Sequence, residues 1–371
     1  MPFFKILIYI MVNYKDVFDK LFKNPTDTFI FVYTPPKVGS TTIVTSLRIS
    51  LGKSVNVMHI HDDIMLHVLT GIHGVNIMDF IRYISNKGKK VYIIDIYRDP
   101  IERKISEFFY KINDLHFNVP VSKVLSYNNN LLIKRMNNLF PHLSDVDYYM
   151  QLFKDDLASF DFKKKYIFRS IDNIKYLKLR LNDVKIWGSI LSTIFKQKIV
   201  IVNDCITNNN IIGNIYQKFK TVYKIPINFF NLIENDPALK FFKSEDERKQ
   251  YLSLWRNKTT NSFNPYTIEQ YNFYLLLSLE NQAHEKIEND HYLDNGCFCD
   301  ACVRQRKLIF IKANNGELIT ERMDHNKNVI EYRKKIDNNN LNKLRTANSI
   351  NKFIKSKIKN KNIININNQL I

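Results

Sequence analysis

Cysteine is scarce in this chain, and its distribution excludes one common way of stabilising a fold. The 371 residues contain four Cys, three of which are clustered at Cys297, Cys299 and Cys302. This spacing does not suit a disulfide framework, and it fits a reducing compartment. We therefore expect a cytoplasmic protein that is stabilised by its core rather than by disulfides.

Long apolar runs are missing as well. The most apolar stretch near the start, FFKILIYIMV, is too short to span a bilayer and has no signal-peptide cleavage pattern. The sequence therefore predicts no membrane span.

Basic residues outnumber acidic residues, and the excess is unevenly distributed along the chain. The formal net charge is +19, and residues 303–371 alone hold sixteen Lys and Arg against five Asp and Glu. The rest of the chain is only moderately basic, so nucleic acid is not the expected partner. The length allows one large α/β core with an appended part, and we place the boundaries at 1–258, 259–310 and 311–371.

A Walker A loop is also absent, although a related turn is present. An apolar run at Phe29–Val32 predicts a strand, the sequence PPKVGSTT follows, and a helical pattern comes next. In Walker A the Lys directly follows the second Gly, whereas here it precedes the only Gly by two residues. The turn still suits a phosphate, because it combines a flexible backbone, a positive charge and the start of a helix. The residues that we assign to phosphate binding are Lys37, Gly39, Ser40, Thr41 and Thr42.

A second strand-to-helix junction follows. Val91–Tyr97 predicts a buried strand, Arg98 ends it, and a helix carrying Ser106 begins at Pro100. The order Asp99, Pro100, Glu102 predicts an N-cap followed by a capping box. The apolar positions of this helix are expected to face the sheet; they are Ile101, Ile105, Phe108 and Ile112.

Together the two junctions resemble those of sulfotransferases that use 3′-phosphoadenosine 5′-phosphosulfate (PAPS). P-K-x-G-[ST]-T-T after a strand resembles the 5′-phosphosulfate loop of this superfamily. An Arg followed by a Ser eight residues later resembles its 3′-phosphate site, and Arg98 and Ser106 have this spacing. The helix predicted at Ser244–Trp255, with a capping box from Ser244 to Glu247, resembles capsular-polysaccharide-synthesis members.

The resemblance implies a fold and an activity. The fold would be a P-loop-type α/β three-layer sandwich with a central parallel sheet, followed here by a helical, Cys-rich extension. The activity would be sulfuryl transfer from PAPS to a hydroxyl group, with a carbohydrate as the expected acceptor. Lys37 would stabilise the leaving phosphate, while Arg98 and Ser106 would bind the donor's 3′-phosphate.

Three histidines compete for the role of general base. His59 and His61 lie at the carboxyl end of the strand predicted at Val55–Ile60, on the same side of it. Carbohydrate sulfotransferases place a catalytic His near there. Cytosolic ones place it somewhat over twenty residues before the 3′-phosphate Arg, which matches His73. We rank His61 first, His59 second and His73 third.

Other elements are predicted without catalytic or binding residues assigned to them. Lys165–Arg169 and Lys198–Val202 are predicted as further strands. Leu115–Asp147 has poor periodicity, and the resemblance assigns it to the acceptor pocket. The segment from Lys312 onward is predicted to be a mobile or loosely helical tail.

The cysteine cluster predicts a metal site. Cys297, Cys299 and Cys302 with His291 would supply four ligands that suit tetrahedral Zn²⁺, in a structural role. His284 and Cys205 are alternatives to His291. A metal-free loop of reduced Cys is the competing interpretation.

Two other function classes stay open. A P-loop kinase or nucleotidase would require Mg²⁺ and ATP. A noncatalytic nucleic-acid-binding protein would use the Cys cluster and the basic tail, and its binding would fall steeply with salt.

Overall fold

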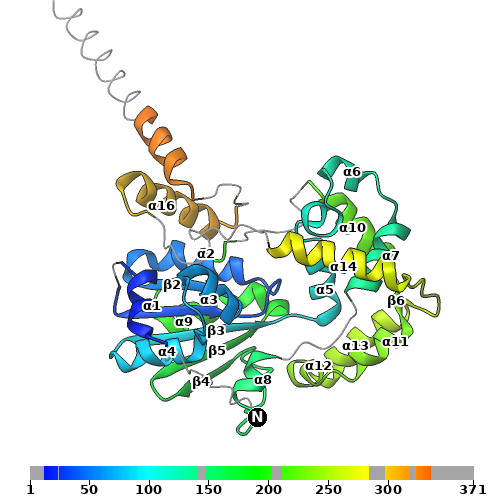
Figure 1. Ribbon diagram of the computed structural model, residues 1–371. Helices are drawn as coiled ribbons and strands as arrows, with labels where there is room; N and C mark the ends of the chain where they lie inside the picture. The colour runs from blue at the N-terminus through cyan, green and yellow to red at the C-terminus, as the bar shows by residue number, and fades with distance from the viewer. Residues whose placement is uncertain are drawn as a thin grey trace, which may run out of the picture. The chain divides into compact units, whose positions relative to one another are not determined.

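The computed structural model describes residues 12–23, 25–140, 147–202, 211–283, 297–317, 319 and 323–335. The chain forms two compact units. The first comprises Met1–Asn295 and Ala313–Ile319, and the second comprises Gly296–Lys312 and Thr320–Ile371. The first unit contains the sheet and the helices α1 to α14 that Figure 1 labels.

The first unit is built on a five-stranded sheet with the order β2-β1-β3-β5-β4. Strands β2, β1, β3 and β5 run parallel, whereas β4 pairs antiparallel with β5 at one edge. The predicted α/β class and central sheet are therefore confirmed, with a sheet that is mostly parallel. The strands are β1 (Thr28–Tyr33), β2 (Asn56–Ile60), β3 (Lys90–Tyr97), β4 (Ile167–Ile171) and β5 (Ile174–Arg180).

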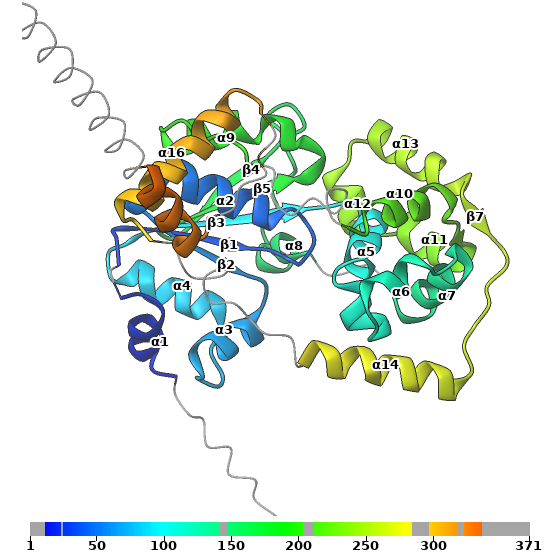
Figure 2. The ribbon, with the colours of Figure 1, turned by 90° about the horizontal axis from the view of Figure 1, so that it is seen from above.

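Helices cover both faces of this sheet (Figure 2). Alternate residues of β1 point to opposite faces, as the strand period of two requires. Phe29 and Phe31 pack with α1, α3, α4 and α8, whereas Ile30 and Val32 pack with α2 and α9. The flanking helices are α1 (Tyr14–Leu21), α2 (Ser40–Leu51), α3 (Asp63–Thr70), α4 (Ile77–Asn86), α8 (Tyr148–Leu152) and α9 (Trp187–Phe195).

The direction in which the chain adds strands to the sheet reverses after β2. The chain leaves β1 through α2 to reach β2 on one side, and it then returns through α3 and α4 to β3 on the other side. The chain therefore leaves the ends of β1 and β3 toward different helices, and a crevice forms at the carboxyl ends of these strands. Both predicted phosphate motifs begin in the loops after these two strands.

A second core, made of helices, follows β3. Figure 2 shows α5 to α7 and α10 to α13 gathered beyond the ends of the strands. The apolar stripe Ile101, Ile105, Phe108 and Ile112 packs into this helical core, so the prediction that it faces the sheet is wrong. The helices are α5 (Pro100–Phe108), α6 (Val121–Leu125), α7 (Asn129–Leu139), α10 (Gly213–Val222), α11 (Ile227–Glu234), α12 (Pro237–Phe242), α13 (Glu245–Arg256) and α14 (Ile268–Ala283).

The two predicted capping boxes had different outcomes. Ser244 and Glu247 form one at the start of α13, as expected. Helix α5 begins at Pro100 with Asp99 as its N-cap, but the Asp99 side chain pairs with Lys243 at 2.9 Å and makes no capping hydrogen bond. Glu102 instead accepts hydrogen bonds from Tyr251 and Trp255. These contacts with α13 replace the predicted local ones.

One predicted strand is wrong, and one strand of the five-stranded sheet was missed. Residues 198–202 form no strand; the backbone N–H groups of Val200 and Val202 donate to the hydroxyls of Ser50 and Ser46 on α2. The missed strand is β5, which carries the buried Lys178 and Arg180. These charges interrupt the apolar pattern by which a buried strand is recognised.

Lys178 lies fully buried between two carboxylates. Its Nζ is 2.6 Å from Asp95 Oδ2 on β3 and 2.6 Å from Asp147 Oδ2 at the N-cap of α8. The Tyr176 hydroxyl also donates to Asp95. Burial raises the pKa of Asp95. Burial alone would lower the pKa of Lys178, but the two carboxylates outweigh it and raise that pKa.

We expect Lys178→Met to lower the free energy of unfolding by about 3–5 kcal/mol, because it leaves two carboxyl groups buried without their cation. Urea denaturation followed by circular dichroism measures this change. Lys175→Met is the matched control, because Lys175 is exposed on the same strand, and it should change stability by less than about 0.5 kcal/mol. Equal effects of the two substitutions would show that the buried cluster does not contribute more to the free energy of unfolding than an exposed lysine does.

Candidate functional site

The loop after β1 has an unusual backbone. Lys37 and Gly39 both adopt positive φ angles, 64° and 95°, and α2 begins at Ser40. A Cβ on Gly39 would lie 2.8 Å from Leu181 Cδ1 and 3.4 Å from the Trp187 ring. Glycine is therefore required there for both conformation and space. The turn brings the backbone of residues 39–42 to the start of α2, where the helix dipole favours an anion.

Two arginines from the β3 side hold this loop. Arg98 Nη1 donates to the carbonyl oxygen of Lys37 at 2.7 Å, and Arg103 Nε donates to that of Pro36 at 3.2 Å. Lys37 Nζ lies 4.2 Å from the centre of the Tyr110 ring, just after α5. The two predicted phosphate motifs, 61 residues apart, therefore meet in space. Their juxtaposition brings the side chains of Arg98 and Arg103 against the backbone of this loop.

A pocket opens at this junction. Its lining comes from the loop after β1, the end of β3, the start of α5, and the N-terminal ends of α8 and α12. Two carboxylates, Asp147 and Asp236, lie in the same lining as Arg98 and Arg103. The lining residues are Pro35, Val38, Ile96, Tyr97, Arg98, Pro100, Arg103, Asp147, Asp236 and Ala238.

His61 is connected to both sides of this pocket. Its Nδ1 donates to the carbonyl oxygen of Thr34 at 2.7 Å, and its own carbonyl accepts a hydrogen bond from Tyr148 at 2.8 Å. Because a carbonyl only accepts, Nδ1 carries a proton, and the neutral ring has its basic lone pair on Nε2. Thr34 and Tyr148 directly adjoin the pocket residues Pro35 and Asp147.

The other two candidate bases are placed differently. His59 is buried, and its ring lies 4.6 Å from that of His61, centre to centre. The predicted common side of these two residues is therefore confirmed. His73 is exposed in the turn between α3 and α4 and stacks on His67 at 3.9 Å. Geometry thus links His61 to the crevice more directly than His73.

Ser106 is buried in α5 and is not among the residues that line the pocket. Arg103, one turn before it, reaches the loop instead. The sequence analysis missed Arg103, Asp147 and Asp236 as lining residues. Arg103 has a weak signal in the sequence, since it is the one basic residue in the first turn of α5, whereas Asp147 and Asp236 approach the crevice only through the fold.

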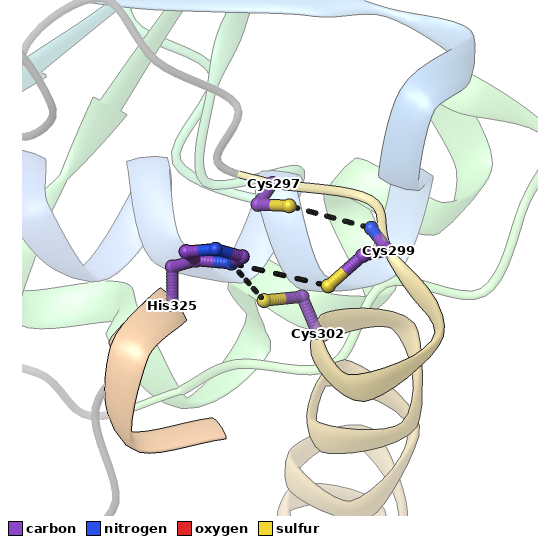
Figure 3. A group of neighbouring side chains, drawn as sticks. All are labelled: Cys297, Cys299, Cys302 and His325. Carbon is purple, nitrogen blue, oxygen red and sulfur yellow. Dashed lines mark hydrogen bonds between the residues drawn. The ribbon is translucent and has the colours of Figure 1, made fainter. Parts of the chain in front are cut away.

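The three clustered cysteines come together in the second unit (Figure 3). The fourth residue of the group is His325, which the sequence analysis did not consider; His291, His284 and Cys205 lie outside the described residues. The ligand atoms of Cys297, Cys299, Cys302 and His325 all lie within 4.8 Å of one another. The backbone N–H of Cys302 lowers the pKa of the Cys299 thiol to about 7, whereas burial raises the pKa of Cys302.

Neither a protein-family model, nor a curated protein, nor a solved structure matches the chain. Among the described helices, none combines the length and apolar character that crossing a membrane requires. The function therefore has to be inferred from the chemistry of the residues themselves.

We expect Gly39→Ala to lower the free energy of unfolding by more than the roughly 1–2 kcal/mol of a left-handed non-glycine residue. The extra cost comes from the contacts of the new methyl group with Leu181 and Trp187. Gly71→Ala is the matched control, because Gly71 has a φ of 67° and no atom within 4 Å of its Cβ position. Thermal or urea unfolding of both variants gives the comparison, and equal losses would argue against a tightly packed loop.

Proposed function

We propose that this protein transfers a sulfuryl group from PAPS to a hydroxyl acceptor, expected to be a carbohydrate, on a P-loop-type α/β fold. The observation that carries the proposal is the hydrogen bond from Arg98 to the carbonyl oxygen of Lys37. It joins the two segments that resemble the 5′-phosphosulfate loop and the 3′-phosphate site. Their meeting point is the crevice where parallel α/β sheets bind nucleotides. We expect the reaction to take place in the cytoplasm.

The donor would be bound by both segments. The backbone N–H groups from Gly39 to Thr42, with the hydroxyls of Ser40, Thr41 and Thr42, suit the 5′-phosphate at the start of α2. Arg98 has five N–H donors in a planar fork, so it can hold the loop and bind a 3′-phosphate with one side chain. Ser106 would contribute to the 3′-phosphate site only if α5 shifts or the donor reaches beyond the described pocket.

The chemistry would require charge stabilisation and a base. The acceptor oxygen attacks the sulfur atom of the donor, and the bond between that sulfur and the 5′-phosphate oxygen breaks. Negative charge develops on the leaving phosphate oxygen. Lys37 would neutralise this charge as it forms. His61 would take the acceptor's proton on Nε2, the basic nitrogen of its neutral ring.

The donor site can be tested before any acceptor is known. We expect calorimetric titration of the full-length protein to show micromolar binding of 3′-phosphoadenosine 5′-phosphate, with ADP at least tenfold weaker. Arg98→Ala should weaken binding by about ten- to a hundredfold, because it removes a charged hydrogen-bond donor to phosphate. Arg82→Ala, on the exposed face of α4, is the control and should bind normally.

Other results would favour the other function classes. Equal affinity for ADP, or tighter binding of ATP with Mg²⁺, would contradict the PAPS assignment and favour a kinase or nucleotidase. Binding of an oligonucleotide with a steep salt dependence, without nucleotide binding, would favour the nucleic-acid-binding class.

The catalytic roles separate in turnover measurements. With release of 3′-phosphoadenosine 5′-phosphate from PAPS as the readout, in the presence of a pool of glycans, we expect Lys37→Ala to abolish turnover. We expect His61→Ala to lower kcat about 10²- to 10⁴-fold, because a general base is lost. His73→Ala is the matched control. Normal turnover of His61→Ala would instead move the base to His59 or His73, and the single variants at those positions would show which.

A further inference from the structure

We propose that Cys297, Cys299, Cys302 and His325 form a structural Zn²⁺ site that ties together two helices described in the second unit. The group belongs to the second unit, whereas the residues assigned to PAPS belong to the first, and the proposal does not depend on that assignment. It differs from the sequence-based ligand set in its fourth member, since His325 replaces His291.

The side chains have nearly the spacing of a tetrahedral site. His325 Nδ1 lies 3.9 Å from Cys299 Sγ and 3.6 Å from Cys302 Sγ. Zinc–sulfur bonds of about 2.3 Å and zinc–nitrogen bonds of about 2.0–2.1 Å place S and N about 3.6 Å apart in a tetrahedron. Figure 3 shows the four side chains converging on a common point. Little movement is therefore needed to bind a metal.

The ligand types select zinc. Three thiolates and an imidazole suit Zn²⁺, whereas Ca²⁺ and Mg²⁺ prefer oxygen ligands. A typical iron–sulfur cluster needs four Cys ligands, which this group does not supply. Four protein ligands complete the zinc coordination and leave no position for a substrate, so the role is structural.

Two helices begin at the site. Helix α16 (Asp300–Asn314) starts directly after Cys299 and carries Cys302 in its first turn. Residues 325–335 are helical from His325 onward, and the Asp324 side chain accepts a hydrogen bond from the backbone N–H of Lys327. Three thiolates with one Zn²⁺ carry a net charge of −1, and the positive ends of both helix dipoles stabilise that charge.

Further hydrogen bonds support the sulfur atoms. The backbone N–H of Cys299 donates to Cys297 Sγ at 3.4 Å, and the amide of the buried Asn328 donates to Cys302 Sγ at 3.5 Å. Asn328 lies one turn after His325 on the same helix. Such supporting contacts orient metal ligands and raise metal affinity.

The described residues of the second unit bury few apolar side chains. Among its described residues, the buried apolar side chains are Ala301, Cys302 and Ile309. A core this small does not stabilise a fold alone, and units of this kind depend on a metal or on disulfides. Zinc binding would therefore supply the folding free energy of this unit.

The ligand assignment is tested with the full-length reduced protein. We expect one zinc per chain by elemental analysis, and Co²⁺ loading to produce the visible absorption of a tetrahedral thiolate site. His325→Ala should weaken zinc binding about a hundredfold or more in competition with a chelator, since even supporting residues contribute ten- to a hundredfold. His291→Ala is the matched control and should bind zinc within about twofold of the unchanged protein.

Two further measurements separate a ligand from a residue that only supports the fold. His325→Cys should retain the metal and intensify the thiolate-to-Co²⁺ charge-transfer absorption, because a fourth thiolate replaces the imidazole. Removing zinc with a chelator should abolish hydrogen-exchange protection in residues 300–312 and 325–335 while leaving β1 and β3 protected. Absence of bound zinc or Co²⁺ would overturn the proposal, and so would loss of metal in His291→Ala but not in His325→Ala.

Discussion

One buried ammonium group connects the parts of the sheet on which the candidate site is built. Lys178 joins β5 to Asp95 on β3 and to Asp147 at the start of α8. Charges removed from water must compensate one another closely, so these three elements tolerate little relative movement. Asp95 lies on β3, whose last residue directly precedes Arg98, and Asp147 lines the pocket. The cluster therefore fixes both the strand end that carries Arg98 and one wall of the crevice.

The loop after β1 depends on the same kind of constraint. Three side chains hold its backbone, because Arg98, Arg103 and His61 each donate a hydrogen bond to one of its carbonyl groups. These bonds offset the cost of the left-handed conformation at Lys37, which a non-glycine residue adopts only when its surroundings impose it. The protein's own hydrogen bonds thus hold this loop in one conformation. A site held in this way would lose little conformational entropy on binding an anion.

Local patterns allowed much of this region to be predicted. Neighbouring residues alone determine the apolar runs of β1 and β3 and the helix start at Pro100. The same holds for the positions of Lys37, Gly39 and Arg98 after these strands. Errors arose where distant residues decide the outcome. Strand β5 was missed because Lys178 finds its carboxylates on other elements, and 198–202 was taken for a strand although serines on α2 bind its N–H groups. Ser106 fits the spacing of the sulfotransferase motif, yet it is buried and does not line the pocket. The apolar stripe of α5 packs into a helical core that local periodicity does not reveal.

The cysteine cluster also shows that local sequence patterns do not reveal contacts between distant residues. Three ligands are recognisable because they are close together in the sequence, and proximity also suggested His291 as the fourth. In the structure His325 reaches the group because the chain returns to it after α16, and it is the one histidine that follows the cysteines in the sequence. A contact formed by such a return closes a loop, and closing it costs entropy that the few buried apolar side chains among the described residues of this unit do not offset. A bond to a metal is strong enough to do so, which is the physical reason for placing a ligand on each side of that loop.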